Sequence, residues 1–133
     1  MSEYQRSLDL ERLAEKVINK YAEFMHLTDP DCRILYQYCD EAKKSRDKIL
    51  YADTERIKDK LKGVLPFDFV ITFYKPNTDT LNQECLERLM YHELRHVGFE
   101  GAGKYSIIPH DIEDFRDVID MWGFDWVRSN EKR

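Results

Sequence analysis

The residues best suited to chemistry in this chain lie between His92 and His96. The two histidines are four residues apart, and side chains at that spacing lie on the same face of an α-helix. Both imidazoles could therefore bind one metal ion. Glu93 is rotated by about 100° from His92 on a helix, so its carboxylate would stand beside the ion and could take a proton from a bound water.

These five residues read H-E-x-x-H, a pattern typical of zinc-dependent peptidases, in which the glutamate is the general base. Histidines four apart can also lie on an ordinary helix surface or form a metal clip without catalysis. The helix is otherwise apolar, however, and burying two histidines and a glutamate is costly unless they are paired or metal-bound. The sequence therefore predicts a Zn²⁺ site with His92 and His96 as ligands and Glu93 as catalytic base.

A catalytic zinc usually has three protein ligands and one open position, so a further ligand is needed. His110, which follows Pro109, is the first candidate. Asp111, Glu113 and Asp114 are the acidic alternatives, since carboxylates also serve as third ligands. An acid that does not bind the metal could instead accept the second ring N–H of a ligand histidine, and we prefer Asp114 for that role.

Amide hydrolysis also needs a donor that stabilises the oxyanion. Tyr105 and Arg95 are the candidates near the motif in sequence. Each has a simpler interpretation, Tyr105 as a packed strand residue and Arg95 as a solvated side chain.

The helix that carries the motif is expected to begin at Thr80, which forms a capping-box pattern with Gln83, and to end at Gly98. Apolar residues recur along two sides of it, so it should be largely buried. They are Leu81, Cys85 and Leu89 on one side, and Leu86, Met90, Leu94 and Val97 on the other.

The other segments predict both helices and strands around this helix. We expect further helices over 8–25, over 54–61 with Asp53 as N-cap, and over 111–122; strands are expected over 32–39, 48–52, 67–74 and 104–108. The fold class is therefore α+β, with a small mixed sheet packed against the active-site helix and flanking helices. The strand 69–74 could bind an extended peptide if it lies at a sheet edge, or it could be a plain core strand.

The composition predicts one globular domain over residues 1–133, with a helical segment in 1–30 and a frayed charged tail in 127–133. Hydrophobic residues make up 42% of the chain, enough for a real core, and the net charge is −5. That charge argues against nucleic-acid binding through a broad basic face.

The cysteine count and the hydropathy indicate a cytoplasmic protein. The three cysteines form no C-x-x-C pair, which fits a reducing compartment. No stretch resembles a signal peptide or approaches 18 apolar residues, so no membrane association is expected.

Three segments, 91–98, 109–115 and 122–123, together resemble the phage metallopeptidases, small zincin domains of phages and prophages. The likeness covers 31–126 and leaves the first helix outside. More loosely, the chain is similar to the SprT-like minimal zincins, although it lacks the cysteine zinc ribbon that many of them carry. The resemblance implies a minimal zincin-like domain with Zn²⁺ ligands His92, His96 and His110, and with Glu93 as base. It also implies a phage or prophage origin and a bacterial host cytoplasm.

Two functions from different classes follow. The first is a zinc metallopeptidase that hydrolyses peptide bonds in a peptide or protein substrate. The alternative is a non-catalytic, zinc-stabilised protein-binding module of phage or prophage origin. A third, weaker hypothesis is a metal hydrolase that acts on a substrate other than a peptide. The sequence makes no prediction of oligomeric state.

Overall fold

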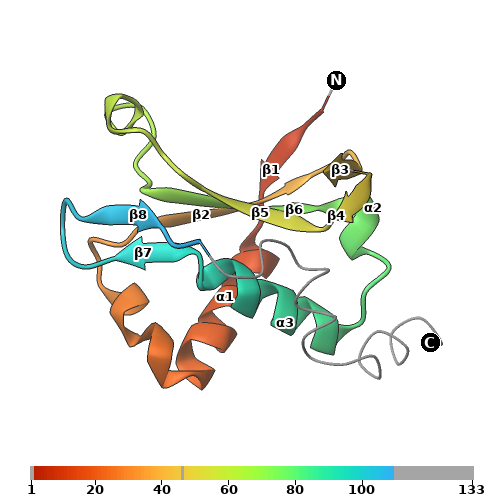
Figure 1. Ribbon diagram of the computed structural model, residues 1–133, viewed down its shortest axis with the longest axis horizontal. Coiled ribbons are helices and arrows are strands. Elements are labelled where there is room, and N and C mark those ends of the chain that lie inside the picture. The colour runs from red at the N-terminus through yellow and green to blue at the C-terminus, as the bar shows by residue number, and fades with distance from the viewer. Residues whose placement is uncertain (1, 46, 110–133) are drawn as a thin grey trace.

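The structure is a computed structural model, and it describes residues 2–45 and 47–109 of the 133-residue chain. Figure 1 shows the order of its elements along the chain. They are β1 (Tyr4–Arg6), α1 (Leu8–Lys20), the 3-10 helix η1 (Ala22–Thr28), β2 (Ile34–Cys39), β3 (Lys43–Ser45), β4 (Lys48–Leu50), β5 (Ala52–Arg56), the 3-10 helix η2 (Asp59–Leu61), β6 (Phe69–Tyr74), α2 (Lys75–Thr78), α3 (Gln83–Leu94), β7 (Val97–Phe99) and β8 (Tyr105–Ile107).

The main sheet has the strand order β1-β2-β6-β5 within the described part of the chain. The pairing is mixed, because β2 and β6 are parallel whereas β1–β2 and β5–β6 are antiparallel. Two hairpins, β3–β4 and β7–β8, lie outside this sheet. The predicted α+β class with a small mixed sheet is confirmed.

Strand β6 is central rather than at an edge, since β2 pairs with one side of it and β5 with the other. Its backbone is therefore used on both sides, and the hypothesis that a peptide adds to 69–74 is wrong. The core-strand interpretation is correct. Phe69, Ile71 and Phe73 alternate along β6 on one face and are fully buried, as expected for a strand whose side chains fill a core.

Helices α1 and α3 cover that same face of the sheet (Figure 1). Helix α1 contributes Leu10 and Val17 to the core, and α3 contributes Leu89 and Met90. Burying a side chain of this size stabilises the fold by roughly 1.5–3 kcal/mol. The apolar face of α3, the helix with the H-E-x-x-H pattern, thus packs against the sheet and is held there.

The N-terminal helix begins where the sequence predicted, with Ser7 Oγ accepting a hydrogen bond from the Leu10 amide at 3.1 Å as N-cap. It ends earlier, at Lys20, because Tyr21 is extended (φ −118°, ψ 119°). The apolar stripe continues in the tighter geometry of η1, where Phe24 and Leu27 are buried.

The predicted helix over 54–61 is wrong, as is the role of Asp53 as its N-cap. Residues Ala52–Arg56 instead form β5, and only Asp59–Leu61 are helical. Pairing with β6 decides this, because a neighbouring strand supplies hydrogen bonds that local propensity cannot foresee. The Asp53 carboxylate accepts a hydrogen bond from the Tyr74 hydroxyl at 2.7 Å.

The ends of the motif helix also differ from the prediction. The N-cap is Asn82, which accepts from the Cys85 amide at 2.9 Å, whereas the Thr80 hydroxyl donates to the Asn77 carbonyl. The helix ends at Leu94, and Gly98 lies inside β7. A Cβ on Gly98 would lie 2.7 Å from the Ser106 carbonyl oxygen, so the glycine serves the close approach of β7 to β8.

The remaining predicted elements are three strands within the described residues and one helix outside them. Strands over 32–39, 48–52 and 104–108 appear as β2, β4 and β8. The helix predicted over 111–122 lies outside the described residues. Within the described ranges, no helix has both the length and the apolar character needed to cross a membrane.

Candidate metal-binding and catalytic site

His92 and His96 converge at the C-terminal end of α3. His92 is only 2% exposed, and His96 is half-buried just beyond the helix end. Their Nε2 atoms lie 3.2 Å apart. Two nitrogens at about 2.05 Å from one zinc ion, at a tetrahedral angle, would be about 3.3 Å apart. In this structure the two nitrogens are within hydrogen-bond distance of each other, and the same spacing fits two ligands of a single zinc-like ion.

The ring of His96 is held in one tautomer by the end of the β7–β8 hairpin. Its Nδ1 lies 2.8 Å from the carbonyl oxygen of Ile108, and a carbonyl can only accept. Nδ1 must therefore carry the proton, which leaves the lone pair on Nε2, the atom that faces His92. The amide of Ile108 also donates to the His96 carbonyl at 2.8 Å. This is the kind of support that orients ligand histidines in metal sites.

Glu93 is a buried carboxylate beside the histidine pair. It is 3% exposed, and its Oε2 lies 3.8 Å from His92 Nε2, beyond hydrogen-bond distance. Its Oε1 accepts a hydrogen bond from the Thr54 hydroxyl at 2.8 Å. Burial raises the pKa of Glu93 to about 8; the bond from Thr54 opposes the rise, and the charge of Asp53 adds to it. A nearby cation would act in the opposite direction and favour the charged form of this carboxylate.

The predicted third ligand cannot be placed. Within residues 2–45 and 47–109, no three His, Cys, Asp or Glu side chains come close enough together to hold a metal ion. His110 and the acidic alternatives Asp111, Glu113 and Asp114 lie outside the described residues. Their roles stay predictions.

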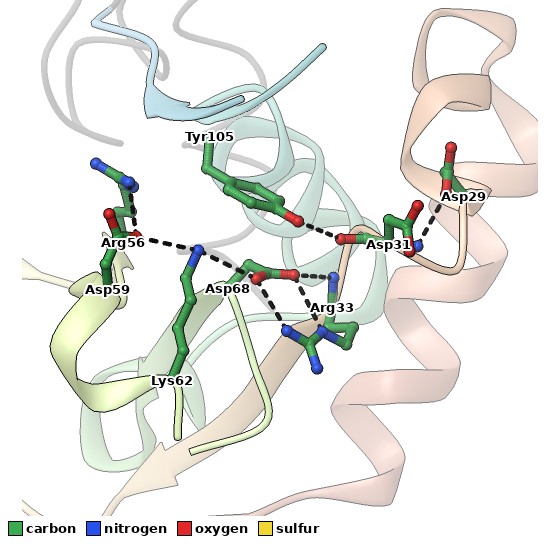
Figure 2. A network of polar contacts seen from close by, with 8 residues as sticks. All are labelled: Asp29, Asp31, Arg33, Arg56, Asp59, Lys62, Asp68 and Tyr105. Carbon is green, nitrogen blue, oxygen red and sulfur yellow. Dashed lines mark hydrogen bonds and ion pairs between the residues drawn. The ribbon is translucent and has the colours of Figure 1, made fainter. Parts of the chain in front are cut away.

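The two candidate oxyanion donors are engaged elsewhere in the structure. The Tyr105 hydroxyl donates to the Asp31 carbonyl at 2.9 Å (Figure 2), and its ring lies 5.6 Å from that of Phe99. Arg95 is exposed, with its guanidinium 5.8 Å from the Tyr91 ring. These contacts are those expected of a packed strand residue and a solvated side chain.

An ionic network surrounds the buried Asp68 next to β8, and Figure 2 shows its members. Asp68 is fully buried and accepts from the Arg33 amide at 2.9 Å and from the Arg33 guanidinium at 3.3 Å. Lys62 Nζ lies 3.4 Å from the same carboxylate and 3.9 Å from the centre of the Tyr105 ring. Through Lys62 and Tyr105, the network connects the main sheet to β8.

Sequence reasoning missed two groups that contact the site. The sequence predicts a helix at Thr54, and nothing in its neighbourhood indicates a contact with Glu93. The carbonyl of Ile108 has no sequence signal, because every residue carries one. Both depend on strand pairing that brings distant segments together.

Comparison with known proteins agrees with the motif. No curated protein and no solved structure matches the chain. One family model, described as "Putative phage metallopeptidase", matches residues 2–132. The match includes α1, so the family likeness is wider than the 31–126 expected from the motifs. The chain, over almost its whole length, thus belongs to this phage metallopeptidase family.

Proposed function

We propose that the protein is a zinc-dependent peptidase in which His92, His96 and His110 bind the metal and Glu93 is the general base. One observation carries the proposal: two Nε2 atoms 3.2 Å apart with a buried carboxylate beside them. Membership of a metallopeptidase family supports the same reaction class. The minimal zincin-like character of the domain is part of this proposal.

His110 is favoured as third ligand by its short chain distance from the site. Ile108 is bound to His96 by two hydrogen bonds, one to the ring and one to the backbone. His110 is two residues beyond Ile108 in the sequence, nearer to this contact along the chain than the acidic alternatives. Asp111, Glu113 and Asp114 follow it along the chain.

The residues present would divide the work of hydrolysis. Zinc, when bound, supplies Lewis acidity that activates water and polarises a peptide carbonyl. Glu93 accepts the proton of the attacking water and passes it to the leaving amine. The apolar packing of α3 around Glu93 limits access of bulk water, which strengthens electrostatic interactions at the site.

The peptide would be held along β5 rather than β6. Strand β5 is at the end of the strand order, so no strand is hydrogen-bonded to its outer edge among the described residues, although β8 packs close to β5. Its residue Thr54 contacts Glu93. An extended peptide that paired with this edge would run past the catalytic carboxylate.

The decisive experiment is the Glu93→Gln substitution in zinc-loaded protein. Gln keeps the size of the side chain but cannot take the proton, so we expect retained zinc and a loss of peptide cleavage of at least about 100-fold. Glu100→Gln, an exposed glutamate of the β7–β8 hairpin, is the matched control and should cleave normally. Cleavage that is unchanged in Glu93→Gln would contradict the proposal.

The same experiment distinguishes the peptidase from a non-catalytic, zinc-stabilised binding module. Such a protein would hold zinc stoichiometrically, lose stability on chelation and cleave no peptide in a library. Its binding function would survive Glu93→Gln.

A further inference from the structure

We propose that Thr54 is a positioning residue for Glu93, holding one carboxylate oxygen so that the other faces the histidine pair as the proton acceptor. The inference rests on the proposed function, in which Glu93 is the base. It assigns a role to a residue 39 positions away in sequence, on a different element.

The register of β5 explains why Thr54 reaches α3. Thr54 pairs with Ile71 on β6, and its neighbours in the same alternation pair with Phe73 and Phe69. These β6 side chains fill the core beneath the sheet, and residues directly opposite each other project to the same face. Thr54 therefore projects toward the helices, into the layer where α3 lies (Figure 1).

The hydroxyl of Thr54 contacts Glu93 twice. Its Oγ1 lies 2.8 Å from Oε1 and 3.2 Å from the backbone carbonyl oxygen of the same residue. That carbonyl, in the last turn of α3, also accepts a hydrogen bond from the His96 amide at 3.0 Å. A hydroxyl has one proton, and the contact with Oε1 is the shorter of the two. The Thr54 proton is therefore expected on Oε1.

This contact separates the roles of the two carboxylate oxygens. With Oε1 held by Thr54, Oε2 is the oxygen on the side of His92 Nε2, at 3.8 Å. Without the hydroxyl, the terminal torsion of Glu93 would be free to turn, since its preferences are broad. The carboxylate could then move onto the metal as a ligand or away from the attacking water.

A purely structural role for Thr54 makes a different prediction. If the hydroxyl only satisfies a buried carboxylate, its removal should lower stability but leave turnover by the folded protein unchanged. The test must therefore separate kcat from folding and from substrate binding.

The experiment compares Thr54→Val with Thr54→Ser in zinc-loaded protein. Valine keeps the branched shape without the hydroxyl, so we expect kcat to fall by about 10- to 100-fold, with KM within about twofold, because a misplaced base loses much of its effect. Serine keeps the hydroxyl and should restore kcat. If Thr54→Val does not fold, Thr54→Ala also lacks the hydroxyl and replaces it in the comparison.

Thr72→Val is the matched control. Thr72 lies on the neighbouring strand, is buried, and accepts a hydrogen bond from Gln37 at 3.0 Å. It is paired with Asp53, on the other face of the sheet from Thr54. Removing the Thr72 hydroxyl should change the stability of the protein without changing kcat.

A second readout does not depend on cleavage. The visible absorption of the Co²⁺-loaded protein reports the ligands and geometry of the metal, so it should change in Thr54→Val and return to the wild-type form in Thr54→Ser. If the wild-type protein cleaves no peptide, the proposed peptidase function is refuted. The Co²⁺ spectra alone would then test whether Thr54 positions Glu93. A Thr54→Val variant with wild-type kcat, or with a wild-type Co²⁺ spectrum in a protein that cleaves nothing, would overturn the inference.

Discussion

Replacing Asp68 by asparagine should destabilise the fold by about 3 kcal/mol, because it breaks a buried ionic contact. Removing one partner from a buried ion pair typically costs 3–5 kcal/mol. Asp68 is 0% exposed and accepts from the Arg33 amide and guanidinium as well as facing Lys62. The Arg33 side chain is 46% exposed and can be rehydrated, which places the expected loss at the lower end of that range.

The chain offers a matched control on the same lysine. Asp59 lies 3.3 Å from Lys62 Nζ and 3.1 Å from the Arg56 guanidinium (Figure 2). Its side chain, however, is 77% exposed. Exposed pairs contribute about 0–1 kcal/mol. Asp59→Asn removes the same charge and should therefore lower the free energy of unfolding by less than about 1 kcal/mol.

Urea unfolding followed by circular dichroism measures both variants against wild type, and equal m-values would show that only stability has changed. The reasoning would be refuted if the two variants lost similar free energy, or if Asp68→Asn lost less than about 1 kcal/mol. Burial would then not decide the strength of these contacts.

The contacts of Asp68 with Arg33 and Lys62 also predict that stability depends on pH. Burial raises the pKa of Asp68, but the hydrogen bonds and charge of Arg33, with Lys62, outweigh it and hold the pKa below its usual value. The folded protein therefore binds fewer protons at this group than the unfolded chain does. Its stabilising contribution is full above the unfolded-state pKa of about 3.9 and is lost as the pH falls through the folded-state pKa. The difference between wild type and Asp68→Asn should shrink below about pH 4.

Two further predictions concern the metal site and the hairpin beside it. His92→Ala and His96→Ala should each lose bound zinc in metal analysis of the purified protein, since two ligands cannot replace three; full occupancy in His110→Ala would move the third ligand to a neighbouring acid. Gly98→Ala should lower the free energy of unfolding by about 1–3 kcal/mol in urea titrations, because a Cβ would meet a backbone carbonyl of the facing strand. Gly63→Ala, where a Cβ meets nothing within 4 Å, is its control, and an equal loss in both variants would refute the steric argument.

Local spacing in the sequence was enough to identify the central part of the candidate site. Residues four apart on a helix share a face whatever the rest of the fold does, so the pairing of His92 with His96 and the position of Glu93 beside them followed from the motif. The apolar periodicity of α1 and the branched, aromatic run of β6 also predicted their elements. In these elements the local signals agree with the folded chain.

Element boundaries were less predictable, and one element was wrong. Thr80 and Gly98 looked like helix ends, but Asn82 caps α3 and Gly98 serves strand packing. The segment after Asp53 had a helical pattern and became β5. For Gly98 and β5 a partner strand decided the outcome, which local propensity does not contain. The start of α3 is decided locally, because Asn82 accepts from the Cys85 amide.

Only the tertiary structure decided how the site is supported. Thr54 meets Glu93 because β5 pairs with β6 in one register, and the Ile108 carbonyl meets His96 because β8 folds back on β7. The sequence by itself determined which side chains can bind a metal and move a proton, since that depends on residue type and helical spacing. Their orientation depends on contacts between segments far apart in the chain, which form only when the sheet and hairpin close.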